Sequence, residues 1–277
     1  MGHEVGGRGY PAAAFRAQMK FLKENFRVVP LSRMVEVVRA GLAPEGEVAL
    51  TFDDGLRNHA TVVYPALREF GLPATFFVSP GLIERSGWLS SYETRVRLNS
   101  LAPAGLRGVL GEIGAPPGVV VDVVNWMKTL GAADRRNVEH VVRERTPGFL
   151  PTAEERLRFD VMTWEELLSL SPELITIGSH TVNHAMLPGC PDEDLDQEIA
   201  ESRRWLEKRL GRPVEYFCYP DGGYDDRSLA LVRRHYSAAV TVRPGFARQG
   251  DDVYLLRRIP LPRSVAGLAW RLHCPGT

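Results

Sequence analysis

The sequence has few cysteines, no surplus of charge of either sign and no long apolar run. Its three cysteines are widely spaced and form no CxxC pair, so no disulfide framework is expected. The 34 basic and 34 acidic residues give a formal net charge of +0. This balance argues against a nucleic-acid partner, because such proteins usually carry a basic surplus. No stretch of about 18 apolar residues is present, so we expect no membrane span.

A secretory leader is also missing from the printed sequence. The first residues, MGHEVGGRGYP, contain no apolar core of the kind a signal peptide has. An odd number of unpaired cysteines fits a reducing compartment. We therefore expect a cytoplasmic protein, or a secreted one from which a leader has been removed, and the sequence leaves the oligomeric state open.

What is present is an alternation of short apolar stretches with amphipathic ones. Such alternation predicts a parallel sheet with helical crossovers. One segment, 84–160, breaks the rhythm, and we interpret it as a helical insertion within a single domain, 1–277. The insertion has two weaker helical stretches, 92–112 and 122–145. The predicted strands are 47–52, 74–79, 174–180, 214–220, 238–242 and 253–259, and the predicted helices are 12–26, 59–71, 192–211 and 227–236.

Two polar motifs directly follow predicted strands. Asp53 and Asp54 come after LTF, and two adjacent carboxylates repel and are costly to bury without a cation. His180 and His184 follow LITIGS, and on a helical turn their rings would face one way, as in many metal sites. Because functional residues of parallel α/β folds gather where strands end, both motifs are expected in one pocket.

This combination predicts a hydrolytic metal centre. Two imidazoles and one carboxylate leave a coordination position open for water or substrate, and the second carboxylate is then available as a base. Taken alone, a DD pair after a strand is usually a loop start or a helix N-cap, and an HxxxH pair is usually surface or core. The joint occurrence favours the metal centre. Zn²⁺ suits these ligands best, and Co²⁺, Ni²⁺ or Fe²⁺ would also fit.

The motifs resemble those of a known family. LTFDDG and GSHTVNH resemble the first two motifs of the polysaccharide deacetylases, the NodB-homology domains of carbohydrate esterase family 4, and FCYPDGGY (217–224) resembles the third. The resemblance covers about residues 10–260 and is poorest in the insertion. It implies a distorted (β/α) barrel of about seven parallel strands, and metal-assisted removal of an N-acetyl group from a poly-, oligo- or small saccharide.

The resemblance also implies roles for individual residues. Asp53 would be the general base, and the backbone N–H of Asp221 would stabilise the oxyanion. The metal ligands would be Asp54, His180 and His184.

The third motif departs from the family pattern. The arginine that orients the base in the family aligns with Cys218. Arg257 and Arg258, near the end of the last predicted strand, are candidates to replace it. We favour Arg258, with a plain surface charge as the alternative. Asp221 replaces the usual aromatic residue, and either contacts substrate or caps the PDGG turn.

The proton donor for the leaving amine is also not obvious. The family uses a histidine in a Leu-x-His motif, of which no clean copy exists here. His3 resembles the arrangement in circularly permuted members, and we prefer it to His273 in the tail. Tyr219 and Tyr224 flank the third motif and are candidates to stack on a sugar.

Three functions remain open on this evidence. The leading interpretation is a metal-dependent N-deacetylase whose partner is an N-acetylated sugar. A hydrolase of another non-peptide C–N bond, such as a cyclic imide, would use the same chemistry. The third is a non-catalytic carbohydrate-binding protein. The intact DD and HxxxH motifs argue against this function, and the missing arginine of the third motif argues for it.

Overall fold

The protein is built on a seven-stranded parallel sheet whose strands follow one another in sequence order. The structure, a computed structural model, describes residues 10–273. Arg258, at the end of the last strand, donates to Thr51 and Asp53 beside the second strand, so the sheet curls into a distorted barrel. The strands are β1 (Arg27–Val29), β2 (Glu47–Phe52), β3 (Ala74–Val78), β4 (Ile175–Ser179), β5 (Tyr216–Cys218), β6 (Ala238–Pro244) and β7 (Leu256–Arg258).

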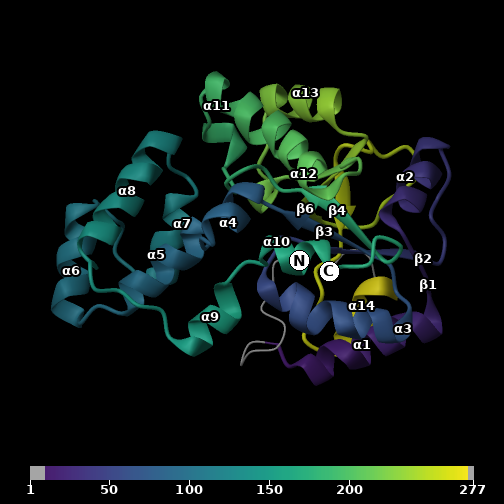
Figure 1. Cartoon of the computed structure of the whole chain (residues 1–277), viewed down its shortest axis with the longest axis horizontal. Coiled ribbons are helices and arrows are strands. Elements are labelled where there is room, and N and C mark those ends of the chain that lie inside the picture. Colours follow the sequence, from purple (N-terminus) through teal and green to yellow (C-terminus); the bar gives the residue numbers. More distant parts are fainter. Residues whose placement is uncertain (1–9, 274–277) are drawn as a thin grey trace.

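Helices cover the outside of this sheet (Figure 1). The apolar spacing predicted in the first of them is confirmed, because Phe15, Met19 and Leu22 of α1 are buried. A capping box starts α10, since the Thr163 hydroxyl accepts from the Glu166 N–H and the Glu166 carboxylate accepts from the Thr163 N–H. These helices are α1 (Ala12–Asn25), α2 (Leu31–Arg39), η1 (His59–Val63), α3 (Tyr64–Phe70), α4 (Pro80–Arg85), α10 (Trp164–Leu168), α11 (Asp192–Asp196), η3 (Gln197–Glu201), α12 (Ser202–Leu210), α13 (Asp226–His235) and α14 (Val265–His273).

Several local predictions were wrong in detail. Strand β1 and helix α2 were not predicted. A three-residue strand carries too little alternation to be recognised, whereas Leu31, Met34, Val35 and Val38 of α2 do have helical spacing and are buried. The predicted helix 192–211 is divided, since η3 forms a π-helical segment between α11 and α12. Strands β5 and β7 have three residues each, shorter than predicted.

The helical insertion is confirmed as a run of helices between β3 and β4, to the left in Figure 1. It has its own hydrophobic cluster, which includes Leu98, Val123 and Val142. The predicted stretch 92–112 splits where Pro103 starts a new helix, because proline cannot continue the preceding one. That the chain is a single domain remains a prediction. The insertion helices are α5 (Ser90–Asn99), α6 (Pro103–Glu112), α7 (Val120–Met127), α8 (Ala132–Glu144) and α9 (Ala153–Phe159).

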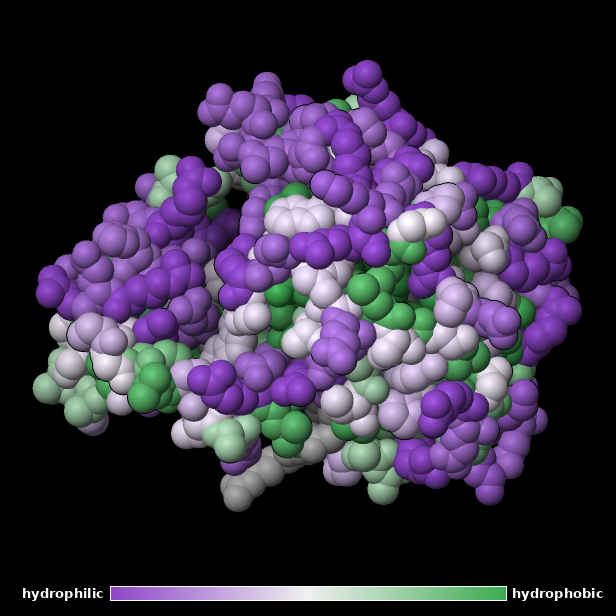
Figure 2. All heavy atoms as spheres, in the orientation of Figure 1, coloured by the Kyte–Doolittle hydropathy of each residue, from purple (hydrophilic) through white to green (hydrophobic). Residues whose placement is uncertain are grey.

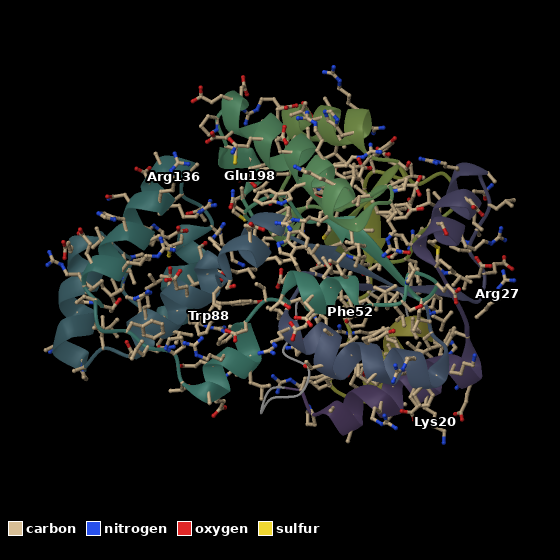
Figure 3. The ribbon with its side chains drawn as sticks, in the orientation of Figure 1. Lys20, Arg27, Phe52, Trp88, Arg136 and Glu198 are labelled. Carbon is tan, nitrogen blue, oxygen red and sulfur yellow. The ribbon has the colours of Figure 1, made fainter. Side chains whose placement is uncertain are left out.

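The insertion is fastened to the barrel at its base. Trp88 lies at this junction (Figure 3), and its Nε1 donates to Asp160 Oδ1 at 2.8 Å. The returning chain pairs with the segment that follows the two aspartates. Leu56 and Val161 form an antiparallel bridge, and the Met162 N–H donates to the Gly55 carbonyl at 2.9 Å. Residues 55–57 are therefore shared between barrel and insertion.

The outer surface is mainly polar on the face shown in Figure 2, with apolar residues emerging in patches between hydrophilic ones. Beneath it, the main hydrophobic cluster joins α1, the inner strands and α12 through residues such as Phe15, Phe76 and Leu206. Among the described helices, none is both long and apolar enough to cross a membrane.

Candidate metal centre

The two aspartates leave β2 in an unusual backbone conformation. Asp54 has φ 74° and Gly55 has φ 62°, both in the left-handed region. A Cβ on Gly55 would lie 3.0 Å from Val78 Cγ1, so glycine is needed there for space as well as for conformation. Asp53 and Asp54 are 6% and 7% exposed. This strained turn sets both carboxylates at the carboxyl end of the sheet, and such strain is common at functional sites.

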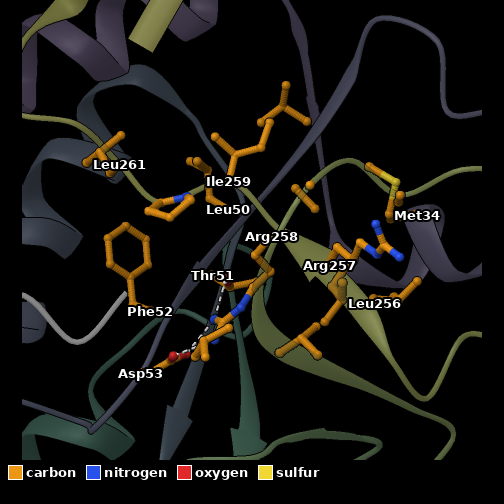
Figure 4. Close-up of a pocket in the computed structure, with 18 of the residues that line it drawn as sticks. Met34, Leu50, Thr51, Phe52, Asp53, Leu256, Arg257, Arg258, Ile259 and Leu261 are labelled. Carbon is orange, nitrogen blue, oxygen red and sulfur yellow. Dashed lines mark hydrogen bonds and ion pairs between the residues drawn. The ribbon is translucent and has the colours of Figure 1, made fainter. Parts of the chain in front are cut away.

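Arg258 forms an ion pair with Asp53, the contact that we expected of it (Figure 4). The guanidinium donates to both carboxylate oxygens, with Nη1 2.7 Å from Oδ1 and Nη2 2.6 Å from Oδ2. Burial would raise the pKa of Asp53, but positive groups around it, Arg258 foremost, together lower that pKa far below its usual range. Asp53 is therefore an oriented, ionised carboxylate at neutral pH.

Arg258 is itself fixed in place. Its Nε donates to the Thr241 carbonyl at 2.6 Å, and one Nη lies 3.3 Å from the Cys218 sulfur. The resemblance implied that Cys218 stands where the family usually has an arginine. The Arg258 side chain from β7 packs against this cysteine. Figure 4 shows Arg257 pointing to the opposite side, towards Met34, because adjacent residues of a strand face opposite ways.

The two histidines converge, but not through a helical turn as we expected. Residues 181–183 form a non-helical turn, in which Thr181 has φ 63°, and His184 itself has φ 59°. Buried Glu198 stabilises this turn, since its carboxylate accepts from the Asn183 N–H at 2.9 Å. The imidazole centroids end 4.7 Å apart. The i, i+4 spacing predicted the pairing correctly and its backbone wrongly.

Both imidazoles face Asp54. Its Oδ1 lies 3.5 Å from His180 Nε2 and 3.4 Å from His184 Nε2, longer than a normal hydrogen bond. The Nδ1 of His180 lies 2.7 Å from the Cys218 carbonyl, so it donates there and leaves Nε2 for a metal. Burial would raise the pKa of Asp54, but the two histidines lower it well below its usual range.

These three residues fit a divalent metal ion. Their ligand atoms all lie within 4.8 Å of one another, and two imidazoles with one carboxylate are a donor set typical of catalytic zinc. A second grouping, Asp53, His180 and Cys218, is equally close. It fits less well, because burial raises the pKa of the Cys218 thiol and Arg258 already holds Asp53.

A cavity of about 970 Å³ includes this cluster in its lining. Asp221, with φ 50°, also lines it, and its Oδ1 accepts from Lys128 Nζ at 2.7 Å. The insertion contributes further lining residues, Tyr92, Arg95 and Lys128. Sequence reasoning missed these three, because the insertion carries no motif and only the folded chain brings α5 and α7 to the strand ends.

Comparison with known proteins agrees with this geometry. A sequence profile described as polysaccharide deacetylase matches residues 41–240, which is most of the chain. The chain belongs to the polysaccharide deacetylase family. YxkH of Bacillus subtilis (strain 168), also named for this family, is 22% identical over 263 residues, which are 94% of this chain and 68% of YxkH.

Two solved deacetylase-like structures share the fold of this family member. The Streptococcus pyogenes deacetylase PplD, in complex with acetate, has a TM-score of 0.63 at 20% identity and covers 94% of this chain and 86% of PplD. IcaB from Ammonifex degensii has a TM-score of 0.62 at 17% identity over 97% of both chains. A shorter match of 66 residues, 39% identical, covers 23% of this chain and 10% of the poly-β-1,6-N-acetyl-D-glucosamine N-deacetylase of Escherichia coli (strain K12).

The remaining predicted site residues of this deacetylase-family chain lie in different places. Tyr219 is 0% exposed and packs against Phe217 and Tyr224 in the core, so its ring is not available to stack on a sugar. His273 ends α14 beside Phe26 and does not line the cavity. His3 lies outside the described residues.

Proposed function

We propose that this member of the polysaccharide deacetylase family is a metal-dependent N-deacetylase acting on an amino sugar. The observation that carries the proposal is the convergence of Asp54, His180 and His184 beside a second carboxylate, Asp53, that Arg258 keeps ionised. The short match to an N-acetyl-D-glucosamine polymer deacetylase supports an N-acetylated sugar as the substrate.

We assign to these residues the roles that the family resemblance implies, which the positions of their side chains support. Asp54, His180 and His184 would hold a divalent ion, which would lower the pKa of a bound water and polarise an amide carbonyl. Asp53 accepts a proton from the attacking water, and Arg258 orients Asp53 for that transfer. We assign the backbone N–H of Asp221 to the oxyanion. Water adds to the carbonyl carbon and the C–N bond breaks, which releases acetate and a free amine. The proton for that amine is predicted to come from His3.

The proposal is tested by acetate release from the Zn²⁺-reconstituted protein. The substrates are N-acetylglucosamine, its β-1,4 and β-1,6 oligomers and, for comparison, a cyclic imide. We expect acetate from at least one N-acetylated sugar and a release at least about 100-fold slower with an Asp53→Asn variant. Ring opening of the imide without acetate release would favour the alternative hydrolase. Sugar binding without release of either product would favour a non-catalytic binder.

A further inference from the structure

Asp54 is held in place by the insertion as well as by its own loop after β2. We propose that Tyr92, from the helical insertion, is a positioning residue that fixes Asp54 as a one-oxygen metal ligand. The inference rests on the metal centre proposed above and concerns a residue outside the three motifs. Tyr92 lies in α5, 38 positions along the chain from Asp54.

The two oxygens of Asp54 have different surroundings. Oδ1 faces the Nε2 atoms of His180 and His184. Oδ2 accepts a hydrogen bond from the Tyr92 hydroxyl at 3.0 Å. With Oδ2 engaged, the carboxylate presents Oδ1 to the point where the imidazole nitrogens converge. A hydrogen bond to a ligating carboxylate also limits its rotation, so the ligand set is oriented before metal arrives.

Tyr92 is held rigidly by the insertion. Its ring lies 4.9 Å from the ring of Phe159 in α9. The guanidinium of Arg95 lies over both rings, 5.4 Å from the Tyr92 centroid and 5.1 Å from that of Phe159. Directly after Phe159, the chain pairs with residues 55–57, where the Asp160 carbonyl accepts from the Arg57 N–H at 2.7 Å. The loop of Asp54 and the support of Tyr92 are therefore tied together.

A purely structural role for Tyr92 makes a different prediction. Packing on Phe159 depends on the ring, whereas the contact with Asp54 depends on the hydroxyl. Tyr92→Phe keeps the ring and removes only the hydroxyl, so a packing role predicts little change in metal affinity. Loss of a hydrogen bond to a metal ligand typically weakens metal binding about 10- to 100-fold. The two roles are separated by this one atom.

The test is the affinity of the purified full chain for Zn²⁺ alone, measured by competition with a chromophoric chelator. We expect Tyr92→Phe to bind Zn²⁺ about 10-fold or more weakly than wild type. The unfolding temperature of the metal-free protein should fall by only about 2 to 4 °C, because one hydrogen bond is lost and the ring packing is kept. The matched control is Tyr64→Phe, which removes a hydroxyl that accepts one backbone hydrogen bond, from the Ser171 N–H, away from the site. The control should bind Zn²⁺ like wild type.

A second readout uses Co²⁺, whose visible absorption bands report the geometry of its ligands. Tyr92→Phe should change these bands, and Tyr64→Phe should not. Zn²⁺ affinity within twofold of wild type, with unchanged Co²⁺ bands, would overturn the inference and leave the proposed function standing. If wild type and Asp54→Ala bind Zn²⁺ equally, or if wild type binds none, the metal centre itself is wrong and the proposed function fails with it.

Discussion

The two walls of the cavity are built in different ways. On the barrel wall, Asp53, Asp54 and His180 sit directly after strands, and all three are buried. On the insertion wall, Tyr92 lies in α5 and Lys128 directly follows α7, and both helices contribute to a separate hydrophobic cluster. The first wall is fixed by the sheet register, and the second depends on how the insertion docks on the barrel.

This difference indicates which of the two walls can tolerate changes in sequence without loss of the chemistry. Residues that bind a metal and move a proton must be held within about half an ångström, which strand ends can provide. A helical wall can vary in sequence while the chemistry stays the same. We therefore expect substitutions in the barrel wall to abolish turnover, and substitutions in the insertion wall to change affinity for metal or substrate.

The largest effect is expected at the metal ligands. Asp54→Ala should lose bound Zn²⁺, because two imidazoles without the carboxylate bind the ion too weakly to retain it through purification. Acetate release should fall to the rate of a protein-free blank. Metal content of the purified variant and acetate release measure this. His140→Ala, an exposed histidine of the insertion, is the control and should retain both. Stoichiometric metal in Asp54→Ala would contradict the barrel wall as the site.

The next largest effect is expected at Asp53, where a substitution should change kcat without changing the amount of bound metal. Asp53→Asn should retain Zn²⁺ but lower kcat about 10²- to 10⁴-fold, the usual contribution of a positioned base. The measurement is kcat on metal-saturated protein, with metal content checked on the same sample. Turnover close to wild type would show that Asp53 is not the base.

A smaller effect concerns the pH range of activity. Arg258 lowers the pKa of Asp53, and its removal leaves burial, which raises that pKa. Asp53 must be ionised to act as a base, so Arg258→Met should move the acidic limb of the kcat/KM profile upward, by about 1 to 3 pH units. The control is Arg257→Met, whose side chain points to the other side. Equal profiles for the two variants would contradict the role of Arg258.

The sequence predicted the barrel wall well for a physical reason. A carboxylate pair and a histidine pair placed after buried strands have few other ways to be accommodated, so the two motifs could be expected in one pocket. The choice of Asp54 as the ligand carboxylate came from the family resemblance. Arg258 was also predicted, since it comes from a strand end. The turn that carries the histidines was not, because its conformation depends on Glu198, which comes from another part of the chain.

The insertion wall could not be predicted in the same way. Its helices were recognised, but their docking is decided by contacts such as the Trp88–Asp160 hydrogen bond and the 55–57 pairing. No local pattern in the chain encodes these contacts. The prediction that Tyr219 lines the pocket was wrong because the local sequence pattern was misleading. Its position beside the third motif favoured the pocket, whereas packing against Phe217 and Tyr224 places it in the core.

The smallest expected effect tests whether the insertion wall contributes to the cavity or only docks there. Lys128 pairs with Asp221 at the rim, with side chains 37% and 33% exposed. Such part-exposed pairs are worth about 1 kcal/mol or less, so Lys128→Met should raise KM for the N-acetylated sugar no more than about fivefold. Neither kcat nor Zn²⁺ affinity should change. The matched control is Arg136→Met, which removes another pair between insertion and barrel, Arg136 with Asp194 at 3.7 Å, away from the cavity. An equal rise of KM in both variants would mean that loosened docking is the cause, whereas a rise confined to Lys128→Met would place the insertion wall against the bound sugar.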